Sequence, residues 1–144
     1  MTQMDSLLNF AIYLGVTIPL MILGLFIFIV TTPYQEIALF KEGAYSEDPV
    51  KQNAAKAAAH DIGGKLLGLA IVVASAIYHS VSILDLLVWG GIGIVIQMIG
   101  FYLFNLLTPF QVLSEIPKGN VGVGIFSSRI SIAIGLLTAV LISY

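Results

Sequence analysis

Four long apolar stretches dominate the pattern of hydrophobic and polar positions along this chain of 144 residues: 7–30, 62–78, 83–106 and 121–144. A helix crosses a membrane core of about 30 Å with about 20 residues, and each stretch is close to that length or longer. The pattern therefore predicts an all-α integral membrane protein with four transmembrane helices.

Polar positions between these stretches predict where helices begin and turn. The second stretch extends upstream through the alanine-rich segment "NAAKAAAHD", because Asp48 followed by Pro49 is a favourable helix start. Only "HSVS" separates the second stretch from the third, so we expect a tight helical hairpin there. The first stretch has no preceding Lys or Arg and no small-residue cleavage site, which predicts a retained helix rather than a signal peptide.

The two halves of the chain resemble each other. A shift of 76 residues superposes Gly15 on Gly91 and "TTPYQ" on "LTPFQ". Past the extra segment "AYSEDPVKQ" in the first half, a shift of 67 superposes Gly68 on Gly135. These matches predict two parallel two-helix repeats, related by an axis along the membrane normal. The expected division is 1–52 for the first span and its loop with the insertion, 53–82 for the second span and outer turn, and 83–144 for the second repeat.

The composition strengthens the membrane assignment and removes other classes of protein. Hydrophobic residues make up 58% of the chain, charged residues 10%, and the mean hydropathy is +1.01, all outside the range of soluble domains. A net charge of -2 with six Lys and Arg provides no basic surface for nucleic acid. Because the chain has no cysteine, disulfides, thiolate metal sites and cysteine nucleophiles are excluded.

The placement of cationic residues predicts the orientation. All six lie on the side of the long loop that follows the first span, or of its counterpart in the second half: Lys41, Lys51, Lys56, Lys65, Lys118 and Arg129. The positive-inside rule then places both long loops in the cytoplasm. Both termini are expected on the periplasmic side of a bacterial inner membrane.

No catalytic, cofactor or metal motif emerges from the polar residues. His60 and His79 lie at opposite membrane faces in this topology, so they share neither a metal nor a proton. No nucleophile and base stand at a shared depth. We therefore expect a protein without enzymatic activity, metal or cofactor.

Small residues recur at four-residue spacing on the second and fourth spans: Gly64 and Gly68 on one, and Ser131, Gly135, Ala139 and Ser143 on the other. Such stripes allow helix backbones to approach closely. They indicate either packing within one bundle or contacts between copies of the chain.

Gln97 is a polar residue near the middle of the third stretch. An amide at this depth usually forms a hydrogen bond to a neighbouring helix. The alternative is that Gln97 lines a permeation path for an ion or small solute.

Arg129 is the cation inside the fourth stretch, roughly 13 Å from the expected cytoplasmic end at 1.5 Å per residue. A lone cation at such a depth costs on the order of 2.5 kcal/mol or more. Asp61 lies at nearly the same depth, since 128 minus the repeat offset of 67 is 61. We therefore predict an ion pair between Asp61 and Arg129, with Lys65 as a competitor or third member. The alternative is an arginine that extends alone to the cytoplasmic surface.

Several segments together resemble a known family. "DSLLNF", "EIALFKEG", "GGKLLGLAIVVASAIYHSVSILDLLVWGGIGIVIQ" and "GNVGVGIFSSRISIAIGLL" are similar to the YjfL-like bacterial inner-membrane proteins, the family of domain of unknown function 350. The resemblance covers nearly the whole chain and implies a four-helix membrane protein of two repeats, with no established enzymatic activity or cofactor. Some relatives are associated with phage-shock-type stress proteins and peptide-bond-forming ligases, which implies a component of an envelope-maintenance system.

These features predict a non-enzymatic, homo-oligomeric structural or scaffolding component of the inner membrane. Its charged loop, residues 36–56, is expected to bind a cytoplasmic partner protein, while membrane lipid surrounds its spans. The alternative is a small channel or transporter for an ion or small solute, with a path past Gln97 and the Asp61 region.

Overall fold

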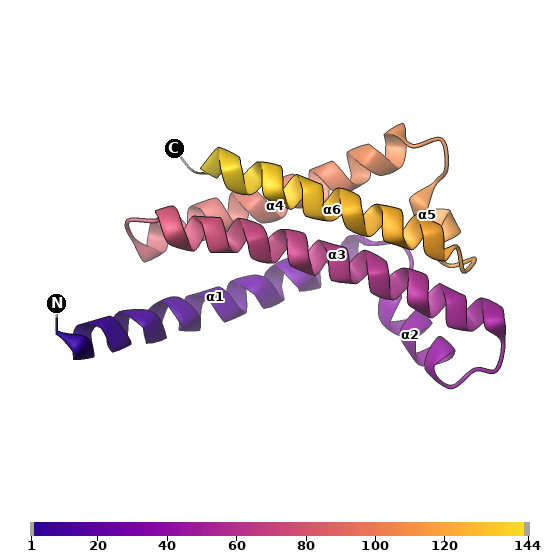
Figure 1. The fold of residues 1–144 in the computed structure, drawn as a ribbon, viewed down its shortest axis with the longest axis horizontal. Helices are drawn as coiled ribbons and strands as arrows, with labels where there is room; N and C mark the ends of the chain where they lie inside the picture. Colours follow the sequence, from indigo (N-terminus) through magenta and orange to yellow (C-terminus); the bar gives the residue numbers. More distant parts are fainter. Residues whose placement is uncertain (1, 143–144) are drawn as a thin grey trace.

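The computed structural model describes residues 2–142, and over this range the chain forms six α-helices (Figure 1). Their bounds are Gln3–Thr31 for α1, Glu36–Ala44 for α2, Pro49–His79 for α3, Ile83–Leu107 for α4, Val112–Glu115 for α5 and Val121–Ile142 for α6. By length and composition, α1, α3, α4 and α6 can each cross a membrane. The predicted all-α architecture with four membrane-spanning helices is confirmed, although residues 143 and 144 of the fourth stretch lie outside the described residues.

Helix starts follow the local chemistry of the sequence. Thr2 accepts a hydrogen bond from the Asp5 N–H, and the Asp5 carboxylate accepts one from the Thr2 N–H in return. Asp48 accepts a hydrogen bond from the Val50 N–H, and Pro49 occupies the first turn of α3 as predicted. Both caps satisfy backbone donors that the helix itself leaves free.

Two short helices occupy segments that the sequence pattern predicted as loops. With nine and four residues, α2 and α5 are too short to produce a recognisable hydrophobic period. In addition, α3 continues without a break across the expected boundary between residues 52 and 53. Each half of the chain thus runs long helix, short helix, long helix, while the relation of the halves as repeats stays a prediction.

The four long helices form a bundle in which α3 contacts α1, α2, α4 and α6 (Figure 1). α1 and α4 run in one direction, and α3 and α6 run in the other. The start of α1 and the end of α6 therefore lie at the same end of the bundle as the α3–α4 turn. The helices α2 and α5 lie at the opposite end, which we call the short-helix end.

Small residues allow α3 and α6 to touch through their backbones. A Cβ atom placed on Gly64 would lie 2.3 Å from the Ser128 Cα, and one placed on Gly135 would lie 2.4 Å from the Gly68 carbonyl oxygen. The Ser131 carbonyl oxygen would lie 2.4 Å from a Cβ atom on Gly68. In the structure, these predicted stripes pack against each other within one bundle.

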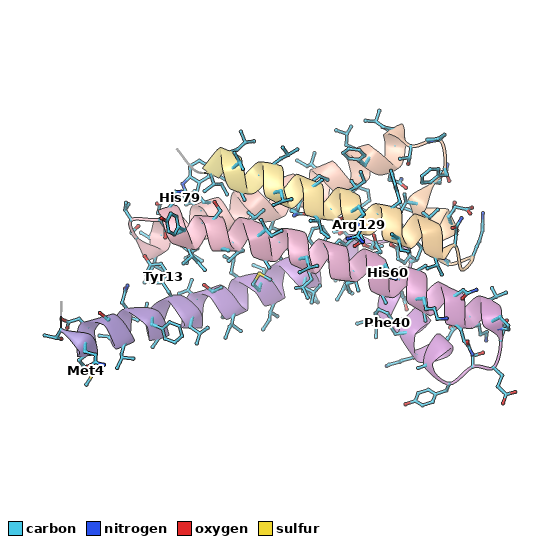
Figure 2. All side chains as sticks on the ribbon, in the orientation of Figure 1. Met4, Tyr13, Phe40, His60, His79 and Arg129 are labelled. Atoms are coloured by element: carbon cyan, nitrogen blue, oxygen red, sulfur yellow. The ribbon has the colours of Figure 1, made fainter. Side chains whose placement is uncertain are left out.

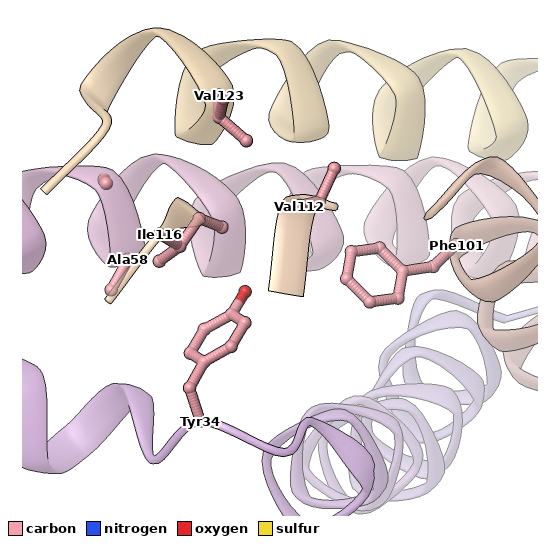
Figure 3. Packing of buried hydrophobic residues seen from close by; sticks show 7 residues of the cluster. Tyr34, Ala58, Phe101, Val112, Ile116 and Val123 are labelled. Carbon is pink, nitrogen blue, oxygen red and sulfur yellow. The ribbon is translucent and has the colours of Figure 1, made fainter. Parts of the chain in front are cut away.

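Apolar side chains fill the bundle around this contact. At the short-helix end the buried cluster consists of Tyr34, Ala57, Ala58, Phe101, Val112, Ile116 and Val123 (Figure 3). Towards the α3–α4 turn a second cluster consists of Leu20, Leu69, Val73 and Ile94. Val112 of α5 belongs to the first cluster, and Leu39 and Phe40 of α2 pack against it, so this cluster joins both short helices to the long ones.

The first half of α1 diverges from the bundle (Figure 1). The buried residues of α1 are Leu20, Gly24 and Phe28, all in its second half. A Cβ atom on Gly24 would lie 2.4 Å from the Leu69 Cδ2, so this glycine sets where α1 meets α3. Residues 3–19 contain no buried side chain.

Candidate functional site: a buried charged cluster

Three ionisable side chains lie completely buried in the bundle and form what we call the buried charged cluster. Asp61 and Lys65 are one turn apart on α3, and Glu36 is the first residue of α2. The Lys65 Nζ lies 2.7 Å from the Asp61 Oδ2 and 3.4 Å from the Glu36 Oε1. Since buried charges are costly unless they are paired and hydrogen-bonded, the remaining partners decide whether this arrangement is stable.

The Lys65 ammonium group has an acceptor for each of its three protons. Besides the two carboxylates, it donates a hydrogen bond of 3.1 Å to the Thr32 Oγ1 at the end of α1. The Nζ atom also lies 4.1 Å from the centre of the Phe101 ring on α4, within range of a cation–π interaction. Lys65 therefore connects α3 to three other elements.

Asp61 extends these connections to the α1–α2 turn and to α6. The Tyr34 hydroxyl donates to the Asp61 Oδ2 at 2.5 Å, and the Ser127 hydroxyl donates to the Oδ1. The Tyr34 ring projects from the turn between α1 and α2 into the bundle (Figure 3). Burial, and secondly the charge of Asp61, raise the pKa of Tyr34, so this phenol remains a hydrogen-bond donor.

Glu36 is less well satisfied than Asp61. Its Oε1 lies near Lys65, but its Oε2 has no hydrogen-bond partner. Burial raises the pKa of Glu36, and the nearby positive charge of Lys65 opposes this effect. With two acids for one base, a proton on Glu36 would balance the charge of the cluster.

The sequence after α1 explains how Glu36 reaches this position. The Thr32 N–H and hydroxyl both donate to the Phe28 carbonyl and end the helix, and Pro33 cannot continue it. The chain turns, and α2 begins against α3. At the far end of α2 a Cβ atom on Gly43 would lie 2.4 Å from the Ala55 Cβ, so the two helices are held closely together.

Arg129 lies outside the buried charged cluster, which corrects the predicted pair between Asp61 and Arg129. Within residues 2–142 no salt bridge joins these two side chains, and Asp61 pairs with Lys65 instead. Equal depth is not sufficient, because the direction around the helix also decides which side chains meet. Ser127, Ser128 and Ser131 are on the buried face of α6, whereas the Arg129 side chain is exposed (Figure 2).

Gln97 lies between α3 and α6 and is 1% exposed. Its Nε2 donates to the Ser131 carbonyl at 3.3 Å and would lie 2.3 Å from a Cβ atom on Gly68. Nearer the α3–α4 turn, the Ser75 hydroxyl donates to the Ala139 carbonyl at 2.7 Å. These contacts make Gln97 an interhelical hydrogen-bonding group, and a permeation path past it stays a prediction.

The two histidines lie far apart along α3. His79 is the last residue of the helix, and its Nδ1 lies 2.9 Å from the Ser75 carbonyl oxygen, whereas the His60 side chain is exposed next to Asp61 in the sequence. No group of three or more His, Cys, Asp or Glu side chains suited to a metal ion occurs in the described part of the chain.

The sequence pattern gave no direct sign of several residues that complete the cluster: Thr32, Tyr34, Glu36 and Ser127. The repeat provides an indirect sign of two of them, because the offset of 76 pairs Tyr34 with Phe110 and Glu36 with Val112. A polar residue whose counterpart is apolar is not required by the packing common to both halves. Such positions are therefore candidates for a role specific to the first half.

The chain as a whole is similar to membrane proteins of unknown function. Residues 1–142 match the family described as Domain of Unknown Function (DUF350). The chain belongs to this family. The UPF0719 inner membrane protein YjfL of Escherichia coli (strain K12) is 36% identical over 137 residues, which cover 94% of each chain. The UPF0719 transmembrane protein YshE of Bacillus subtilis (strain 168) is 32% identical over 136 residues, 94% of this chain and 93% of the relative.

Membership of DUF350 confirms the family resemblance seen in the sequence and identifies a membrane protein. Neither the family description nor the names of these relatives assign an activity. No solved structure matches the chain. The function must therefore be argued from the arrangement of the side chains.

Proposed function

We propose that this DUF350 protein is a non-enzymatic, homo-oligomeric scaffolding component of the bacterial inner membrane, and that residues 36–56 bind a cytoplasmic partner protein. The observation that carries the proposal is Tyr45, which is 95% exposed in the turn between α2 and α3. Exposed aromatic side chains on a fixed support are the usual anchors of protein interfaces.

α2, which ends next to Tyr45, is packed against the bundle at both of its ends, and the surroundings of Tyr45 suit a protein partner. Glu36 is buried at the start of α2, and Gly43 packs closely on Ala55 at its end. Val50, 56% exposed, adds an apolar side chain on the α3 side of the turn. Charged side chains are exposed around them: Lys41, Glu42, Glu47, Asp48, Lys51 and Lys56. An apolar centre with a charged rim is typical of protein–protein contacts.

The polar side chains around Asp61 are engaged in hydrogen bonds inside the protein, which supports a role without catalysis. The Tyr34 and Ser127 hydroxyls both donate to the Asp61 carboxylate inside the bundle, where all three side chains are closed to a substrate. The inner-membrane location is supported by the similarity to YjfL. A role in envelope maintenance rests on the family resemblance alone.

Homo-oligomerisation is supported by the shape of α1. Its residues 3–19 bury no side chain within one chain, and a Cβ atom on Gly15 would meet nothing within 4 Å. A second copy of the chain would cover this half of the helix and use Gly15 for close approach.

Site-specific photo-crosslinking in cells tests the partner proposal. A photoreactive amino acid in place of Tyr45 should yield a discrete cross-linked protein, whereas the same substitution at Tyr78, 84% exposed near the α3–α4 turn, should not. Identical products at both positions, or none at Tyr45, would contradict a specific partner at residues 36–56.

A small channel or transporter is the second candidate, and the buried charged cluster favours it. Ionisable residues inside membrane proteins often mark ion or proton pathways, and Glu36, Asp61 and Lys65 have no exposed surface. Purified protein in liposomes separates the two functions. We expect the liposomes to remain tight to protons and K⁺; a flux that disappears in Glu36→Gln would instead support transport.

A further inference from the structure

A pocket of about 230 Å³ opens between α3 and α6 on the outer surface of the bundle. The residues that matter for its chemistry are His60, Gly63 and Leu67 on α3, and Ser128, Arg129 and Ile132 on α6. Figure 2 shows His60 and Arg129 on these two neighbouring helices. The pocket is separate from the buried charged cluster, which faces the interior.

The pocket is cationic, and none of its lining residues is acidic. The Arg129 and His60 side chains are exposed, and neither has a hydrogen bond or ion pair within residues 2–142. Lys56, one turn before His60 on the same face of α3, is also exposed. Asp61 directly follows His60 in the sequence, but its carboxylate is buried and bound to Lys65. The guanidinium group is thus free to bind an external ligand.

The pocket lies where α3 changes from polar to apolar. Residues 49–60 contain two lysines and His60, whereas the only charged residue between 62 and 78 is the buried Lys65. α6 runs alongside α3, with Gly124 against Ala57 and Ser128 against Gly64. The first turn of α6 therefore lies beside the polar part of α3, and Arg129 lies just past the change from polar to apolar residues, closer to the start of α6 than to its end.

The pocket also has an apolar side. Leu67 and Ile132 line it one to two turns beyond His60 and Arg129, in the direction of the membrane centre. A long arginine side chain can extend from the membrane towards the headgroups while its stem stays beside apolar residues. A cation next to an apolar surface in this way matches a phospholipid, which combines a phosphate with an acyl chain.

We propose that this pocket binds the phosphate group of an anionic phospholipid, with Arg129 as its principal ligand and His60 and Lys56 as neighbouring cationic or hydrogen-bonding groups. The planar guanidinium group can donate two parallel hydrogen bonds to phosphate oxygens. An acyl chain of the same lipid lies along Leu67 and Ile132. Free phosphate offers the same headgroup chemistry but leaves this apolar side unused.

Gly63 provides a test that does not depend on charge. A Cβ atom on Gly63, which lines the pocket, would meet nothing within 4 Å, so a larger side chain there begins in open space and extends into the pocket. Gly91 on α4 is equally free of neighbours and does not line the pocket. Gly63→Leu and Gly91→Leu therefore form a matched pair.

Native mass spectrometry of the full chain from nanodiscs can measure lipid retention. We expect preferential retention of phosphatidylglycerol over phosphatidylcholine with the same acyl chains, and roughly fivefold weaker retention in Arg129→Gln. Gly63→Leu should also lose the preference. Lys41→Gln, which removes an exposed cation from α2, and Gly91→Leu should keep it.

Three results would overturn the proposal. The first is equal retention of both lipids by the wild type, and the second is a loss in Lys41→Gln as large as in Arg129→Gln. The third is displacement of phosphatidylglycerol by millimolar inorganic phosphate, which would assign the pocket to a soluble anion. Because Arg129 is exposed and Gly63 has free space, circular dichroism should show that all variants remain folded.

Discussion

Lys65 shows how one side chain can fix the arrangement of several helices. Its ammonium group contacts Thr32 after α1, Glu36 on α2, Asp61 on α3 and the Phe101 ring on α4. Each contact is modest, but loss of the lysine leaves two carboxylates buried without a cation. Lys65 thus serves as an internal counter-ion for the first half of the chain.

Replacement of Lys65 by methionine should therefore be strongly destabilising. Lys65→Met keeps most of the side-chain volume, and we expect a loss of about 3 to 5 kcal/mol in the free energy of unfolding in detergent. Lys118→Met is the matched control, because it breaks an ion pair with Glu115 in which the lysine is 66% exposed, and its effect should be much smaller.

The double variant Lys65→Met with Asp61→Asn distinguishes a buried charge from lost packing. It should recover part of the loss, since the stranded carboxylate is removed together with its partner. Equal losses in Lys65→Met and Lys118→Met, or simple addition in the double variant, would contradict this role for the cluster.

Glu36 predicts a pH dependence of stability. Burial raises the pKa of Glu36 above the ordinary value of 4.5. The positive charge of Lys65 opposes this increase, and the negative charge of Asp61 adds to it. Between the unfolded and folded pKa values the folded state binds more protons, so the free energy of unfolding falls as the pH rises. Glu36→Gln should reduce this fall, measured as the melting temperature from pH 5 to pH 8. Parallel decreases in the wild type and the variant would argue against it.

At the scale of the elements, α3 and α6 are the contact on which the bundle depends. Their backbones meet at glycine and serine positions, so the two helices are too close to accommodate even one added methyl group at Gly64. Because lipid tails are as apolar as the helix surfaces, the hydrophobic effect does not drive helices together within a membrane. Close packing of this kind stabilises their association instead.

Neighbouring glycines on α3 allow a direct test of this contact. The Cβ atom of Gly64→Ala would lie 2.3 Å from the Ser128 Cα, and we expect a loss of about 1 to 3 kcal/mol in the free energy of unfolding. Gly63→Ala meets nothing within 4 Å and should be neutral or slightly stabilising, because alanine favours the helix. Similar effects at both positions would show that helix propensity, not packing, governs the result.

The elements also show what the sequence could and could not predict. Span lengths and the Asp48–Pro49 helix start follow from local properties, so the long helices were predicted to within a few residues. The repeat offset identified Asp61, although with Arg129 as its partner, and the spacing of one turn on α3 identified Lys65 as a competitor or third member. Glu36 could not, because its burial depends on α2 folding back onto α3, a tertiary contact without a local pattern.

For the molecule as a whole, both ends of the described chain lie at the end of the α3–α4 turn, and exposed Lys41, Lys51, Lys56 and Lys118 lie towards the other end. The positive-inside rule then predicts periplasmic termini and a cytoplasmic short-helix end. A C-terminal alkaline phosphatase fusion should be active in cells, and a fusion at Gly43 should be inactive. The reverse pattern of activities would contradict this orientation.

The long sequence distance between the partners of Asp61 has a consequence for biosynthesis. Its partner Tyr34 precedes it by 27 residues, but Ser127 follows it by 66. When the ribosome has completed α3, this carboxylate must enter the membrane, or wait at its edge, before its α6 partner has been synthesised. Synthesis of α6 therefore completes the set of hydrogen-bond donors to Asp61 that Tyr34 begins. A chain released before α6 is made lacks the Ser127 hydroxyl, and its Asp61 carboxylate has lost one of its two hydroxyl donors.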